Sequence, residues 1–138
     1  MREMVKTWLW VLALAVLPMG MLAALWRAPL SAGEDDVLYY YPLRVQAGKA
    51  LARGDWPIVD PLTAGGMAVL GDPQSAVFFP TTWLFAALPA RPAYSLSIFA
   101  AFITAGVGMW VYLRRLRLAR PAAGFGAVAF MLGGFFVA

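Results

Sequence analysis

Residues 93–113, AYSLSIFAAFITAGVGMWVYL, form a run without a charged side chain. At a rise of about 1.5 Å per residue, a helix of this length covers the roughly 30 Å hydrocarbon core of a bilayer. Arg91 and Pro92 precede the run, and four arginines follow it between positions 114 and 120. We therefore predict a transmembrane helix over 93–113, and this run decides the fold class.

Two other apolar runs predict further transmembrane helices. The stretch 8–26 carries no charge and is long enough to be a span. A cleaved signal peptide is the alternative, because residues 1–6 are basic and Leu30-Ser31-Ala32 resembles a cleavage site, although signal peptides usually have only about 7 to 15 apolar residues. The stretch 121–138 opens with Pro121, which is favoured at the first helical position. We expect a third helix there, truncated by the end of the chain.

Composition agrees with an all-α, polytopic integral membrane protein. Hydrophobic residues make up 62% of the 138 positions and charged residues 13%, whereas about a quarter of the residues of a soluble domain are charged. The chain has no cysteine and no histidine, which excludes disulfides, Cys/His zinc sites and His-based triads within it. The basic residues lie scattered along the edges of the apolar runs, so we expect no nucleic-acid partner.

The distribution of lysine and arginine predicts the orientation. The N-terminus, 1–7, and the arginine-rich connector, 114–120, are expected in the cytoplasm. The long segment 27–92 is then an extracytoplasmic loop, since loops of this length cross the membrane largely regardless of charge. We expect a multi-pass protein of a bacterial plasma (inner) membrane that contacts membrane lipids.

The outside loop begins with three adjacent carboxylates, Glu34-Asp35-Asp36. Clustered carboxylates beside lipid headgroups can bind a divalent cation or hold a proton-accepting group with a raised pKa. The alternative is that Asp35 or Asp36 caps the helix that follows, where acids are favourably placed against the helix dipole. The two roles are compatible.

A short amphipathic helix is predicted after Pro42, ending near Gly54. Its apolar face has the spacing i, i+4, i+7, i+8 and consists of Leu43, Ala47, Ala50 and Leu51. Lys49 and Arg53 lie on another face, where they either anchor the helix among headgroups or bind the phosphate of a lipid-linked substrate. Arg44 suits the second role, because its planar fork pairs with phosphate in a bidentate manner.

The rest of the loop is predicted to form turns, followed by a segment at the membrane surface. Asp60-Pro61, Gly65-Gly66 and Asp72-Pro73 are typical of turns. The stretch 81–88 is apolar but too short to span a bilayer, so we expect it at the membrane surface, with its aromatic side chains as interface anchors.

Taken in order, these motifs resemble the N-terminal region of YfhO-like bacterial membrane proteins. The residues that carry the resemblance are Asp36, Tyr39-Tyr40-Tyr41-Pro42-Leu43-Arg44, Gly54-Asp55-Trp56-Pro57, Asp60-Pro61, Gly65-Gly66-Met67, Asp72-Pro73-Gln74-Ser75-Ala76-Val77-Phe78-Phe79-Pro80 and Leu88-Pro89. It continues through Ala105-Gly106-Val107-Gly108-Met109 and Arg114-Arg115-Leu116. The series covers nearly the whole chain after the first predicted span.

The resemblance implies a multi-span glycosyltransferase of the GT-C superfamily. Such an enzyme takes a sugar from a polyprenyl-phosphate carrier on the outer face of the membrane and delivers it to a cell-envelope acceptor. Asp36 or Asp35 would act as general base or hold a divalent cation, Mg²⁺ or Mn²⁺, while Arg44, Lys49 and Arg53 would bind the carrier phosphate. Because further spans would complete such a site, this chain alone is expected to be inactive.

A second hypothesis requires no catalytic activity. The chain would then belong to a non-enzymatic membrane protein, a transporter or an envelope-assembly component, whose outside loop binds a ligand or partner. Transporters generally place ionisable groups inside their spans. None of the three predicted spans contains Asp, Glu, Lys, Arg or His, which favours the enzyme.

Overall fold

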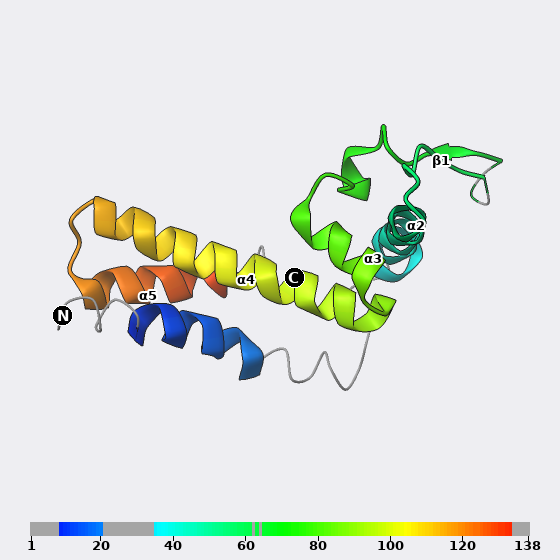
Figure 1. Ribbon diagram of the computed structural model, residues 1–138. Coiled ribbons are helices and arrows are strands. Elements are labelled where there is room, and N and C mark those ends of the chain that lie inside the picture. The colour runs from blue at the N-terminus through cyan, green and yellow to red at the C-terminus, as the bar shows by residue number, and fades with distance from the viewer. Residues whose placement is uncertain (1–8, 21–34, 62, 64, 134–138) are drawn as a thin grey trace. The chain divides into compact units, whose positions relative to one another are not determined.

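The computed structural model describes residues 9–20, 35–61, 63 and 65–133, and these are mainly helical (Figure 1). The chain divides into two compact units. We call Met1–Ala24 together with Ile98–Ala138 the helical unit, and Leu25–Ser97 the loop unit.

The central helix of the helical unit is α4, Ala90–Arg115, whose first residues, up to Ser97, belong to the loop unit. It contains the predicted stretch 93–113 and extends it at both ends, because Pro92 lies in the first turn, where proline is tolerated, and Arg114 and Arg115 continue the last turn. Among the described residues, α4 is the one helix long and apolar enough to cross a membrane.

Two shorter helices lie along α4, Leu9–Gly20 and α5, Arg120–Met131 (Figure 1). The described part of the first falls inside the predicted stretch 8–26, whose ends lie outside the described residues. Pro121 stands in the first turn of α5, as predicted. The helix ends at Met131, earlier than predicted, just before Gly133, a residue that disfavours helix. Residues 134–138 lie outside the description.

Glycines allow the helices of this unit to approach one another. A Cβ atom added to Gly106 would lie 2.8 Å from the Sδ of Met131, and one added to Gly124 would lie 2.3 Å from the ring of Trp10. Gly106 therefore has the packing role expected of a small residue. Gly108, in contrast, has open space around it.

In the loop unit the predicted amphipathic helix is present as α2, Tyr41–Ala52, with Pro42 in its first turn. Leu43, Ala47 and Ala50 are buried, as the spacing predicts. The C-terminus follows a Schellman pattern, in which the amides of Gly54 and Asp55 donate to the carbonyls of Leu51 and Ala50 at 3.0 Å. Gly54 adopts φ +80° and is the stop that was expected.

A wide π-helical turn, η1, Asp36–Tyr40, precedes α2, and a small β-hairpin follows it. The hairpin pairs β1, Val59–Asp60, with β2, Met67–Ala68, in antiparallel register. This ladder corrects the expectation of an all-α chain. Gly65 and Gly66, both at positive φ, allow the reversal that the sequence indicated only as a turn.

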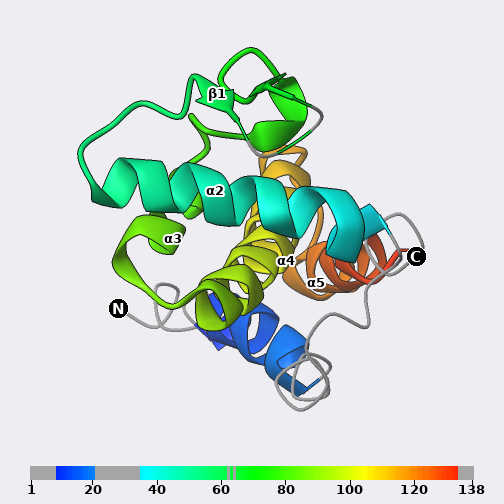
Figure 2. The same cartoon turned by 90° about the vertical axis from the view of Figure 1, so that its right-hand side faces the viewer.

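Three short helical segments complete the loop unit: η2, Pro73–Ser75; η3, Pro80–Trp83; and α3, Leu84–Ala87. Leu43, Ala47, Val69 and Val77 form its core. Figure 2 shows α3 beside α2, and Phe85 is 7% exposed there against Gly48. The expectation that all aromatics of 81–88 anchor in an interface is therefore wrong for Phe85, although Trp83 is exposed.

Candidate functional site

The two candidate catalytic carboxylates stand at the start of a helical run that continues through α2. Asp35 is exposed, and Asp36 is the first residue of η1, its side chain lying outside the described part of the structure. Neither caps α2 itself, because the N-cap position belongs to Tyr40, which makes no capping side-chain hydrogen bond. Both acids nevertheless lie where the dipole of the run favours negative charge.

The turn that carries the acids is tied to a distant part of the loop unit. The hydroxyl of Tyr39 donates a hydrogen bond to Oδ2 of Asp72, 33 residues away. This bond is the main cause that raises the pKa of Tyr39 above its usual value, because the hydroxyl is held in its protonated, donating form. Asp72 therefore helps to set the position of η1.

Asp72 is also the N-cap of η2. Its Oδ1 accepts from the amide of Gln74 at 2.8 Å, and its backbone carbonyl accepts from the hydroxyl of Ser75 at 2.7 Å. The predicted turn role of Asp72 is thus confirmed. Its link to Tyr39 was not predicted, since Asp-Pro indicates a local turn and carries no signal for a partner so far along the chain.

Tyr41, the residue that follows η1, is held by a second contact within the loop unit. Its ring meets that of Tyr94 edge to face, with the centroids 5.4 Å apart, a geometry that aromatic quadrupoles favour. Tyr94 lies in the first part of α4 and is buried. The tyrosine run that follows the carboxylates is consequently held both by η2 and by α4 within the loop unit.

Arg44 is the most unusual of the predicted phosphate ligands. It is half-buried on α2, and its Nε is fully buried without a hydrogen-bond partner among the described residues. Buried polar atoms are nearly always satisfied, and an unsatisfied one asks for an explanation such as an absent ligand. A guanidinium has five donors and no acceptor capacity, so the group it suits is an anion with several oxygens.

Lys49 and Arg53 do not converge with Arg44. At about 100° per residue, Lys49 lies roughly 140° and Arg53 roughly 180° around the helix from Arg44. Both are exposed, and Arg53 already forms an ion pair with Asp55 at 3.5 Å. The structure thus does not bring the three basic residues together.

The remaining carboxylate of the hairpin has a local role. Asp60 is 6% exposed and accepts a hydrogen bond from the hydroxyl of Thr63 at 2.6 Å, in keeping with the predicted turn. Across the described residues, no group of three or more Asp and Glu side chains gathers into a metal site. A cation held by Asp35 and Asp36 stays a prediction, because it depends on the side chain of Asp36.

Comparison of the chain with protein-family models, with curated proteins and with solved structures found no match.

Proposed function

We propose that this chain acts in a membrane-embedded glycosyltransferase of the GT-C type, which takes a sugar from a polyprenyl-phosphate carrier and delivers it to a cell-envelope acceptor. The proposal joins the resemblance of the motif series to one observation, the buried and partnerless Nε of Arg44. That atom belongs to α2, which follows the η1 turn that Asp36 begins.

A bilayer is the first element of the proposal. The 26 residues of α4 would extend about 39 Å at a rise of 1.5 Å per residue, more than the roughly 30 Å of a hydrocarbon core. Only 22% of its most apolar 18-residue stretch is buried within the chain. Large apolar side chains of the two neighbouring helices are also exposed, among them Leu12 and Phe125. Lipid or further helices would cover these surfaces.

Arg44 is the second element. Sugar transfer from a lipid phosphate leaves negative charge on the departing phosphate, which a fixed cation stabilises. Arg44 can supply two parallel N–H donors to such a group. Its half-buried position would strengthen the interaction, because charges attract more strongly where water is partly excluded.

Asp35 and Asp36 are the third element. An acceptor hydroxyl must lose its proton as the glycosidic bond forms, and a positioned carboxylate contributes about 10²- to 10⁴-fold as general base. The tether from Tyr39 to Asp72 would hold the carboxylates relative to Arg44. The absence of Asp, Glu, Lys, Arg and His from 98–113 of α4 supports this hypothesis over the transporter alternative.

The test uses the full-length protein in membrane vesicles, with labelled polyprenyl-phosphate hexoses as donors and envelope extract as acceptor. We expect the D35N/D36N variant to lose transfer by about 10²-fold or more, with expression and membrane insertion unchanged. Transfer at the wild-type rate in this variant would overturn the catalytic role.

Arg44 is tested separately by the binding of polyprenyl monophosphate. R44K keeps the charge but loses the planar fork, so we expect weaker binding, whereas R53Q, which removes an exposed and already paired cation, is the matched control. Equal losses in the two variants would indicate a general effect of charge and count against a phosphate site at Arg44. Phosphate binding without transfer in the wild type would favour the non-enzymatic alternative.

A further inference from the structure

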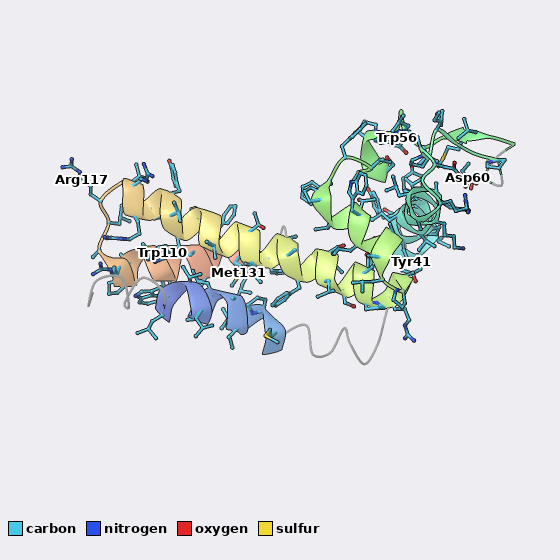
Figure 3. All side chains as sticks on the ribbon, in the orientation of Figure 1. Tyr41, Trp56, Asp60, Trp110, Arg117 and Met131 are labelled. Carbon is cyan, nitrogen blue, oxygen red and sulfur yellow. The ribbon has the colours of Figure 1, made fainter. Side chains whose placement is uncertain are left out.

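The turn between α4 and α5 concentrates positive charge at one end of the helical unit. Arg114 and Arg115 close α4, Arg117 lies in the turn, and Arg120 begins α5. Arg115 and Arg117 are exposed, and Figure 3 shows Arg117 extending away from the helices. The two exposed arginines are thus accessible to a partner outside the chain.

Arg115 and Arg117 have no counter-ion among the described residues of the helical unit. No Asp or Glu occurs after Asp72, and the described residues of the helical unit contain none. Arg115 and Arg117 form no ion pair with any residue that the structure describes. Their charge is therefore available to an anionic group from outside the described residues.

The side chains between the arginines are apolar and exposed. Leu116 is 55% exposed and Leu118 is 36% exposed, so cationic and aliphatic groups alternate along 115–118. Tyr112, one turn earlier, is also exposed. An acidic protein surface would satisfy the arginines but would leave the leucines in a polar environment. The headgroup region of a bilayer satisfies both, because it offers phosphates beside acyl chains.

The backbone of the turn gives an independent indication that Arg117 is present for its charge. The amide of Arg117 donates to the carbonyl of Arg114 at 3.1 Å, and the amide of Leu118 to that of Leu113 at 3.2 Å, the Schellman pattern. Arg117 therefore occupies the left-handed position, at φ +63°, where glycine is strongly preferred. Arg114, in contrast, has a local role, because its guanidinium donates to the carbonyl of Leu118.

We propose that Arg115 and Arg117 bind the phosphate of anionic phospholipids at the membrane surface, with Leu116 and Leu118 inserted beside the headgroup. The proposal rests on the membrane placement given above but not on sugar transfer. It assigns to the α4–α5 turn a lipid-binding surface that is separate in sequence from the candidate site of the loop unit.

The experiment measures the phospholipids retained by the purified chain in detergent, by native mass spectrometry, with phosphatidylglycerol and phosphatidylcholine offered in turn. We expect selective retention of phosphatidylglycerol, and about thirty-fold weaker binding in R115Q/R117Q, which is the effect of removing two surface charges. R53Q is the control, because it removes a cation that is already paired.

A second variant separates binding from folding. R117G removes one charge and also suits the left-handed backbone, so we expect a melting temperature equal to or above that of the wild type, together with about five-fold weaker binding of phosphatidylglycerol. Binding of phosphatidylglycerol by R117G at the wild-type strength, in a variant at least as stable as the wild type, would overturn the proposal.

Four further outcomes would contradict the proposed lipid partner or the membrane placement. Unchanged retention in R115Q/R117Q, or equal retention of both lipids by the wild type, would refute the proposal. Displacement of phosphatidylglycerol by an equal concentration of glycerol 3-phosphate would identify a soluble phosphate as the ligand and refute a bilayer surface. Loss of the wild-type chain from vesicles on alkaline extraction would reject the membrane placement itself, and sugar transfer does not enter any of these readouts.

Discussion

Different interactions stabilise the helical unit and the loop unit, each within itself. In the helical unit, large side chains such as Met131 and Trp10 lie against glycines, and the described residues contain no acid. In the loop unit, side-chain hydrogen bonds to the backbone fix the turns, as Asp72 and Thr82 do. Close packing tolerates small adjustments by neighbouring side chains, whereas a directional hydrogen bond is either formed or lost. We therefore expect the two units to respond differently to similar substitutions.

The largest difference is expected between two glycines that both touch an aromatic residue. A Cβ added to Gly48 in the loop unit would lie 2.3 Å from the Cβ of Phe85 and 2.7 Å from its backbone carbonyl. G48A therefore forces α2 and α3 apart, and we expect a loss of about 1–3 kcal/mol in the free energy of unfolding. In G124A the obstacle is the ring of Trp10, which can turn aside, so a smaller loss is expected. Thermal unfolding of both variants gives the comparison.

Gly108 is the matched control for these glycines. It lies in α4 with open space around it, so G108A should gain roughly 0.5–1 kcal/mol from helix propensity alone. Limited proteolysis would locate the damage of G48A in the loop unit. If G48A were as stable as G108A, the close approach of α2 and α3 would not be part of the folded state.

A smaller difference is expected between two neighbouring threonines of the loop unit. Thr82 is fully buried, and its hydroxyl donates to the carbonyl of Ala76 at 2.7 Å. The hydroxyl of Thr81 is buried without a partner among the described residues. T82V should lower the free energy of unfolding by about 0.5–1.5 kcal/mol, because the hydroxyl's hydrogen bond is lost while the carbonyl of Ala76 still accepts from the amide of Phe79. T81V loses no hydrogen bond and should be neutral or slightly stabilising. Equal effects in denaturant titrations would contradict a directional contribution.

The same contrast explains what the sequence could predict. The length of an uncharged run identified α4, and apolar spacing identified α2, because both signals depend on residues close in sequence. Pro121 and Gly54 marked helix ends for the same reason, since each acts on its own backbone conformation. These elements were predicted to within a few residues.

Features that depend on distant partners were not predicted. The β-hairpin is too short for its alternation to be visible, and Phe85 is buried only because Gly48 of another helix makes room for it. The candidate site shows the same division. Asp35, Asp36 and Arg44 were selected by residue type and local pattern, whereas the tether between Tyr39 and Asp72 joins residues that no local pattern relates.

That tether gives the smallest predicted effect, and it is specific to the loop unit. The pKa of Tyr39 is raised, chiefly by its hydrogen bond to Asp72, so the folded state holds the proton more tightly than the unfolded state, whose pKa is about 10. The stabilisation is therefore complete below about pH 10 and is lost as the pH rises through the folded pKa. We expect the wild type to lose stability more steeply than Y39F between about pH 9 and 12, in denaturant titrations at each pH. D72N should remove most of this difference, since the neutral amide accepts the same bond more weakly. Parallel pH curves for wild type and Y39F would mean that the bond does not hold η1 in solution, and the carboxylates of the candidate site would then lack this support.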